Sequence, residues 1–216
     1  MKWMAGFCLF TAFTMPLMGE ETSAKDDALY SMNFEKEDDG YYPMDFLVLE
    51  GDFQVEPRDG NKVLTLPGQP LNTMGFLFGP TEYENIRVSA RFLGENVKRR
   101  YPRFGVGLCG VMGYKLRINQ ASRSLELYLG DDVVAKAPYK WKSGAWAHVV
   151  MQLTKSPDGK WSVQGKAWTE GDTAPDAWMI EHAVSEDPIS GRPSAWATPY
   201  SGLPIYLDDL KVEKVK

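Results

Sequence analysis

The chain has 216 residues and a formal net charge of −5, with 24 Lys and Arg against 29 Asp and Glu. This mildly acidic balance favours solubility and gives no basic footprint, so we exclude nucleic acid as a partner. The length suits a single domain with a sizeable core.

The N-terminus has the layout of a secretory signal peptide, which we predict over residues 1–24. Lys2 is followed by an apolar stretch, 3–18, that is interrupted by Gly, Thr and Pro and falls short of the roughly 20 residues that a membrane span needs. We therefore expect cleavage after Gly19 or Ala24, no membrane span in the mature chain, and a secreted, periplasmic or cell-envelope location. An uncleaved anchor is the alternative.

The mature chain, residues 25–216, is expected to form one domain without a disulfide. Of the two cysteines, Cys8 lies in the leader and Cys109 is left without a partner. The core must therefore be stable without a disulfide cross-link.

Short runs of β-branched and aromatic residues recur at about ten-residue spacing, separated by Gly, Pro, Asp and Asn, and helical periodicity is nearly absent. This pattern predicts an all-β sandwich or barrel. In chain order, the predicted strands are 53–56, 62–66, 85–93, 103–109, 114–119, 124–129, 133–137, 146–154, 161–168, 178–182 and 205–212.

Alternation along these strands assigns two faces, because successive side chains point to opposite sides. The inward positions are apolar: Val88, Ala90, Phe92, Phe104, Val106, Leu108, Tyr114, Leu116, Ile118, Leu125, Leu127, Leu129, Val149, Met151, Leu153, Trp161 and Val163. The outward positions alternate large hydrogen-bond donors with small residues such as Gly105, Gly107 and Cys109. We interpret these outward positions as one polar face.

Five segments carry a family resemblance. They are Arg103 to Leu108, Gly113 to Leu116, Leu125 to Leu127, Trp141 to Trp146 and Ile205 to Leu210. Together they resemble the concanavalin A-like lectin/glucanase superfamily, in its laminin G-like or carbohydrate-binding jelly-roll branches, from about residue 33 to the C-terminus. The resemblance implies a two-sheet antiparallel jelly-roll sandwich with a concave face that often binds saccharide.

The sequence carries no catalytic signature, and we assign no catalytic residue. The Glu-x-Asp-x-x-Glu strand of retaining glycosidases in the superfamily is missing. The two histidines, His148 and His182, have no partners at zinc-ligand spacing, and neither a Gly-x-Ser-x-Gly motif nor a phosphate loop occurs. A known type of glycosidase or zinc enzyme is therefore not indicated.

Carboxylates near the two ends of the domain predict a structural calcium site. Asp208 and Asp209, taken with Glu35, resemble the arrangement that holds calcium in several carbohydrate-binding jelly rolls, and oxygen ligands suit this ion. The alternative is that the two aspartates only accept hydrogen bonds from loop backbone. No other cofactor is expected.

Aromatic and basic residues of the outward face are the candidate carbohydrate-binding residues. Aromatic rings stack on the apolar faces of sugars, and guanidinium groups form paired hydrogen bonds to hydroxyls or carboxylates. Trp168 lies on the outward face and Trp141 precedes a turn, so both are candidate platforms. The set is Arg87, Arg103, Lys115, Arg117, Tyr128, Trp141, Gln164 and Trp168. An ordinary exposed face, or one covered by a loop, is the alternative.

We predict a secreted, non-catalytic carbohydrate-binding module that binds an extended poly- or oligosaccharide on a concave sheet face. The first alternative is a polysaccharide lyase or another glycan-active enzyme, such as a glycoside hydrolase. In a lyase of this superfamily, Tyr128, Arg103, Gln164 and His148 would supply the required residue types. The second alternative is a structural or protein-binding laminin G-like module, which has no glycan affinity.

Overall fold

The fold is built from β-strands. A computed structural model describes residues 28–82 and 84–215, which contain fifteen strands and no helix. The strands are β1 (Ala28–Met32), β2 (Leu47–Glu50), β3 (Gln54–Arg58), β4 (Asn61–Leu66), β5 (Met74–Leu77), β6 (Ile86–Leu93), β7 (Arg103–Leu108), β8 (Tyr114–Asn119), β9 (Ser124–Leu129), β10 (Asp132–Pro138), β11 (Ala147–Lys155), β12 (Trp161–Thr169), β13 (Ile180–Val184), β14 (Ser194–Thr198) and β15 (Ile205–Lys214). The predicted signal peptide lies outside the described residues.

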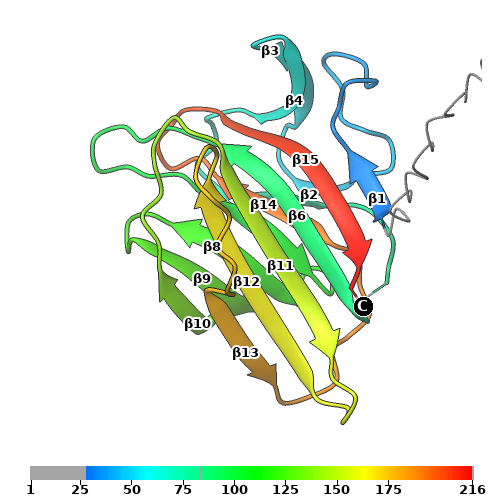
Figure 1. Cartoon of the computed structure of the whole chain (residues 1–216). Coiled ribbons are helices and arrows are strands. Elements are labelled where there is room, and N and C mark those ends of the chain that lie inside the picture. Colours follow the sequence, from blue (N-terminus) through cyan, green and yellow to red (C-terminus); the bar gives the residue numbers. More distant parts are fainter. Residues whose placement is uncertain (1–27, 83, 216) are drawn as a thin grey trace, which may run out of the picture.

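The strands form two antiparallel sheets that stack as the layers of a sandwich (Figure 1). The eight-stranded sheet has the order β13-β12-β11-β6-β15-β4-β3, with β1 also paired to β15. The seven-stranded sheet has the order β10-β9-β8-β7-β14-β5-β2. Strands β6 and β11 of one sheet pack against β7 of the other. The predicted two-sheet all-β sandwich is confirmed.

The core lies between the sheets, where the inward side chains of both meet. Burial alternates along β12, whose odd-numbered residues from Trp161 to Thr169 are all buried. Across the layers, the rings of Phe92 and Phe104 stack with centroids 5.2 Å apart. Both side chains are fully buried, and burying such a side chain contributes about 1.5–3 kcal/mol. The predicted inward positions are buried apart from Leu129, which is 42% exposed.

The structure contains four strands that the sequence pattern did not predict: β1, β2, β5 and β14. All five residues of β14 are buried, as are the first three of β5, so neither strand shows the alternation that reveals a half-exposed strand. The strand predicted over 178–182 lies two residues later, at Ile180–Val184. Cys109 is wrong as a member of the outward face, because it follows β7 and is buried in the core.

Candidate functional site

The structure divides the predicted polar face between two sheets. Arg103, Lys115, Arg117 and Tyr128 lie on β7, β8 and β9 of the seven-stranded sheet, whereas Arg87, Gln164 and Trp168 lie on β6 and β12 of the eight-stranded sheet. The outward sides of two stacked layers face opposite directions. The interpretation as one surface was therefore wrong, because alternation separates inward from outward positions but does not say to which sheet a strand belongs.

Trp141 is wrong as a candidate platform. Its side chain is only 4% exposed, and its ring packs edge-on against Phe104 with centroids 5.8 Å apart. The backbone NH of Trp141 donates to Gln120 Oε1 at 3.0 Å, which fixes the loop segment over the core. Its ring therefore stabilises the fold and is not available to a sugar.

Strand β14 brings a further tryptophan to the outer side of the seven-stranded sheet. The register pairs Trp196 of β14 with Gly105 of β7, and Gly105 with Arg117 of β8. These three positions form one row across the sheet, so Trp196 and Arg117 lie on either side of a residue without a side chain. Sequence reasoning missed Trp196, because the small alanines around it in β14 gave no strand signal.

Glycines make room for the Trp196 ring. A Cβ on Gly75, the residue paired with Trp196 on β5, would lie 2.6 Å from the indole, and one on Gly107 would lie 2.3 Å from Ser194 Oγ. Trp196 Nε1 donates to the same Ser194 Oγ at 2.8 Å. The indole is thereby held against the sheet, and only glycine fits at these two positions.

Three cations lie against the aromatic rings on this side of the sheet. Lys115 Nζ is 4.7 Å from the Trp196 ring centre, and Arg117 Cζ is 5.9 Å from it and 5.7 Å from that of Tyr128. Arg103 Cζ is 5.4 Å from the ring of Tyr200. Such contacts are attractive because the ring face is electron-rich. We call this surface the basic face and define it by Arg103, Lys115, Arg117, Tyr128, Trp196 and Tyr200.

The cations of the basic face form no ion pair within the described part of the chain, although the charge of Asp131 acts on Lys115 and Arg117 from a longer distance. Arg117 Nε is buried and makes no hydrogen bond. Burial lowers the pKa of Arg117 and of Lys115, because it removes water from their charged forms. A buried donor on a cation is costly to leave without an acceptor.

The carboxylate nearest to Arg117 in the register is engaged elsewhere. Glu126 of β9 lies directly opposite Arg117, where a cross-strand ion pair is expected. Its carboxylate is instead surrounded by donors: Asn119 Nδ2 at 2.9 Å, Ser122 Oγ and Ser124 Oγ at 2.8 Å, Tyr128 OH at 2.6 Å and Lys136 Nζ at 3.2 Å. Arg117 is thereby left without its natural counter-ion.

The ionisation of Glu126 and Tyr128 reflects this arrangement. Burial alone would raise the pKa of Glu126, but the hydrogen bonds that it accepts outweigh burial and lower the pKa to about 2. Burial, followed by the hydrogen bond to Glu126, raises the pKa of Tyr128 to about 12. At neutral pH the pair is therefore a carboxylate bound by a neutral phenol.

On the outer side of the eight-stranded sheet, polar side chains form hydrogen bonds with one another. Arg87 donates two hydrogen bonds to Gln152 Oε1, at 2.7 and 3.0 Å, and Gln152 donates to Gln164 Oε1 at 2.7 Å. Trp168 is half-buried on the outward side, as predicted, and stacks on His148 with centroids 4.7 Å apart. Arg87 and Gln164 therefore belong to one hydrogen-bond network, and Arg87 and Trp168 line a hollow together with Lys166 and Trp178, on the opposite side from the basic face.

The residues expected of a lyase are not brought together. Tyr128 and Arg103 lie on the seven-stranded sheet, whereas His148 and Gln164 lie on the eight-stranded sheet. The Tyr128 hydroxyl donates to Glu126, and its raised pKa does not favour a base at neutral pH. This set of four residues cannot act on one substrate.

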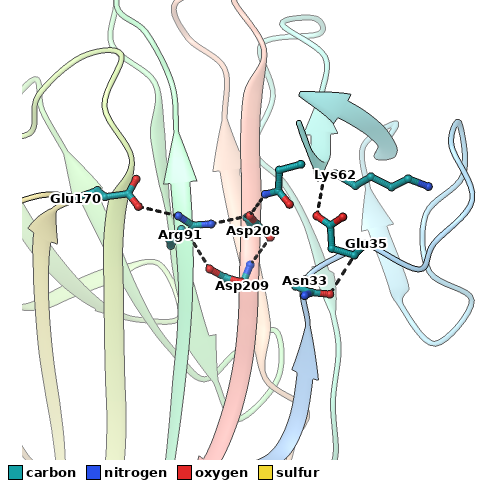
Figure 2. Close-up of polar contacts among 8 residues, drawn as sticks. Asn33, Glu35, Lys62, Arg91, Glu170, Asp208 and Asp209 are labelled. Carbon is teal, nitrogen blue, oxygen red and sulfur yellow. Dashed lines mark hydrogen bonds and ion pairs between the residues drawn. The ribbon is translucent and has the colours of Figure 1, made fainter. Parts of the chain in front are cut away.

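The predicted calcium ligands have protein partners (Figure 2). Asp208 accepts hydrogen bonds from Asn61 Nδ2 at 2.8 Å, Arg91 Nη2 at 2.7 Å and the NH of Asp209 at 2.7 Å. Glu35 accepts a hydrogen bond from the NH of Lys62 at 3.0 Å. No group of three or more metal-ligating side chains occurs in residues 28–82 and 84–215. The two aspartates therefore contact the side chains of Arg91 and Asn61 as well as backbone, and calcium binding stays a prediction.

Comparison with known proteins gives structural likeness only. No protein-family model and no curated protein sequence matches the chain. Carbohydrate-binding module CBM66 from Bacillus subtilis superposes with a TM-score of 0.56 at 8% identity, covering 79% of this chain and 96% of that one. The carbohydrate recognition domain of Emp46p, in its potassium-bound form, has a TM-score of 0.54 at 11% identity, covering 88% and 97%. Protein SO2946 of unknown function from Shewanella oneidensis MR-1 has a TM-score of 0.52 at 11% identity, covering 96% and 97%.

These likenesses identify the class of fold. The chain has a concanavalin A-like jelly-roll fold with two antiparallel sheets, and the fold that the sequence resemblance implied is confirmed. At identities this low, the likeness carries the fold and not the activity. Among the described residues, no helix is long and apolar enough to span a membrane.

Proposed function

We propose that this protein is an exported, non-catalytic module that binds an acidic poly- or oligosaccharide on its basic face. The observation that carries the proposal is Arg117, a partly buried arginine that forms no ion pair in the described part of the chain and whose opposite carboxylate, Glu126, is held by other donors. A uronate carboxylate or a sulfate ester would pair with it in a fork geometry that a neutral hydroxyl matches less well.

The other groups of the basic face suit the rest of a sugar. The rings of Tyr128 and Tyr200 are partly exposed beside the cations, and aromatic rings pack against the apolar faces of pyranoses. Arg103 and Lys115 add donors on either side of Arg117 along the sheet. The similar folds of a carbohydrate-binding module and of a carbohydrate recognition domain support this class of ligand.

Replacing Arg117 with alanine is expected to weaken binding of an acidic oligosaccharide by about 10- to 100-fold, as for loss of a charged hydrogen bond in a desolvated site. Titration calorimetry with oligogalacturonate and with a sulfated oligosaccharide measures the loss and distinguishes carboxylate from sulfate. Arg87→Ala is the matched control, because Arg87 is an outward arginine on the other sheet. The affinity of this variant for the same oligosaccharides should equal that of the wild type. Arg117→Lys should restore binding only in part, because lysine lacks the fork geometry.

Three outcomes would count against this function. Equal losses for Arg117→Ala and Arg87→Ala would mean that the basic face is not the site. Absence of affinity for any glycan would instead favour the protein-binding alternative. Shortening of the oligosaccharide during the titration, with a product that absorbs in the ultraviolet, would favour a lyase.

Export is part of the proposal and is supported by the apolar segment that follows Lys2. Expression with the native N-terminus in a host with a secretory pathway should give a mature protein that lacks about the first 19–24 residues. Intact mass of the purified protein measures this. A protein from the envelope or medium that still begins at Met1 would contradict cleavage.

A further inference from the structure

A second group of arginines lies beside the basic face. They line a hollow formed by Leu71, Arg99, Arg100, Tyr101, Arg103, Ala121 and Tyr200. Arg103 and Tyr200 belong to both surfaces, so the hollow continues the basic face beyond the N-terminal end of β7. None of the sequence patterns pointed to Arg99 or Arg100.

The loop that carries these arginines is tied down. The backbones of Val97 and Arg100 exchange two hydrogen bonds, each 3.0 Å long, which close a tight turn around Lys98 and Arg99. Asn96 anchors this turn, because its side chain donates to the carbonyl of Lys98 at 3.0 Å and its NH donates to Ser143 Oγ at 3.0 Å. The backbone from which the arginines extend is therefore positioned before any ligand arrives.

The charges around the hollow are unbalanced. Within the described part of the chain, Arg99, Arg100 and Arg103 form no ion pair and no side-chain hydrogen bond. Like charges that share one hollow repel each other, and an anion relieves that repulsion. The remaining lining is apolar or aromatic, with Leu71 37% and Tyr200 39% exposed. Guanidinium groups around an apolar floor suit a sugar ring that carries an acidic group.

We propose that this hollow is a second anion subsite, which binds the carboxylate or sulfate of another sugar residue of the glycan held by Arg117. The inference rests on the proposed function and specifies its ligand as a glycan with at least two acidic groups. Arg103 lies two residues along β7 from Gly105, the partner of Arg117. Arg103 and Arg117 are therefore diagonal neighbours on the two strands, and their Cα atoms are about 7–8 Å apart. The hollow lies farther from Arg117, so the two acidic groups belong to different sugar residues.

The test compares two trisaccharides of equal length. One is trigalacturonate, with three carboxylates, and the other carries a single uronate and two neutral sugars. The variant is Arg99→Ala/Arg100→Ala. Its control, Lys36→Ala/Lys160→Ala, removes the same charge from two exposed positions outside the hollow. A trisulfated trisaccharide distinguishes sulfate from carboxylate.

We expect the arginine variant to lose about tenfold in affinity for trigalacturonate, with a larger loss at low salt, and to bind the single-uronate probe as wild type does. Equal affinity of the arginine and lysine variants for trigalacturonate would overturn the subsite, while Arg117→Ala would still test the basic face. Equal losses on both trisaccharides would also overturn it, because the hollow would not recognise a second charge. Failure of the wild type to bind any acidic probe would overturn the proposed function, and the subsite with it.

Discussion

Replacing Arg91 with alanine is expected to destabilise the protein by about 3–5 kcal/mol, the usual effect of removing one partner of a buried ion pair. Arg91 of β6 lies between three carboxylates (Figure 2). Its Nη2 is 2.7 Å from Asp208, its Nε 2.7 Å from Asp209 and its Nη1 2.9 Å from Glu170. Asp208 is 1% exposed, so without Arg91 its charge stays buried with only neutral donors.

The destabilisation caused by Arg91→Ala should depend on pH in a defined direction. Burial already raises the pKa of Asp208, with Arg91 among the groups that oppose the rise. Removing Arg91 raises this pKa further in the folded state. A carboxyl with a raised folded-state pKa destabilises the fold as pH rises through that value, and the effect vanishes below the unfolded pKa. The destabilisation should therefore be largest at neutral pH and shrink as pH approaches the unfolded pKa of an aspartate, about 3.9.

Urea unfolding of wild type and variant at several pH values between neutral and about pH 4 measures both features. Lys160→Ala is the control, because Lys160 forms a highly exposed ion pair with Asp158, at 2.6 Å, and its loss should change stability little. A loss for Arg91→Ala that is as small as the control, or that does not vary with pH, would contradict the role assigned to the Asp208 contact.

Much of the core could be predicted from sequence, because period-two alternation follows directly from strand geometry. The same rule placed Trp168 correctly on an outward face. It failed for β14, where Trp196 stands among small buried residues, and for Trp141, which lies in a loop where alternation has no meaning. A loop tryptophan is buried or exposed according to tertiary packing alone.

The candidate site was only partly accessible to sequence reasoning. Arg103, Lys115, Arg117 and Tyr128 lie on consecutive strands joined by short turns, so their proximity could be expected. Long-range strand pairing decides to which sheet each strand belongs, and it places β14 between β5 and β7. Tyr200 and the arginine hollow depend on loops, whose course no periodic pattern encodes.

The electrostatics of the site were the least accessible feature. A sequence with Arg117 and Glu126 on neighbouring strands predicts at most that they pair with each other. In the structure, the Glu126 carboxylate accepts hydrogen bonds from other donors, among them Ser122 and Ser124 at 2.8 Å. Because several donors compete for one acceptor, the outcome depends on side-chain geometry at the tight turn between β8 and β9.

Replacing Glu126 with glutamine is expected to destabilise the protein at neutral pH by about 2–3 kcal/mol, because hydrogen bonds to a charged group are among the strong ones. The pKa of Glu126 is lowered from 4.5 to about 2 in the folded state. A carboxyl with a depressed folded-state pKa stabilises the fold above its unfolded pKa, and this stabilisation is lost as pH falls through the folded value. The shift sets an upper limit of about 3–4 kcal/mol on this stabilisation at neutral pH.

Urea unfolding at several pH values measures the free energy of unfolding of both proteins. The wild type should be more stable than Glu126→Gln at neutral pH, and this difference should disappear between about pH 4.5 and pH 2. The difference between the two proteins isolates Glu126, since all other carboxyl groups titrate in both. Glu56→Gln is the matched control, because Glu56 is an exposed carboxylate on β3, and its stability should follow wild type at every pH. Equal stability of Glu126→Gln and wild type at neutral pH would mean that the five donors do not hold this carboxylate. Glu126 would then be free to pair with Arg117, and the reason to expect an anionic ligand there would be lost.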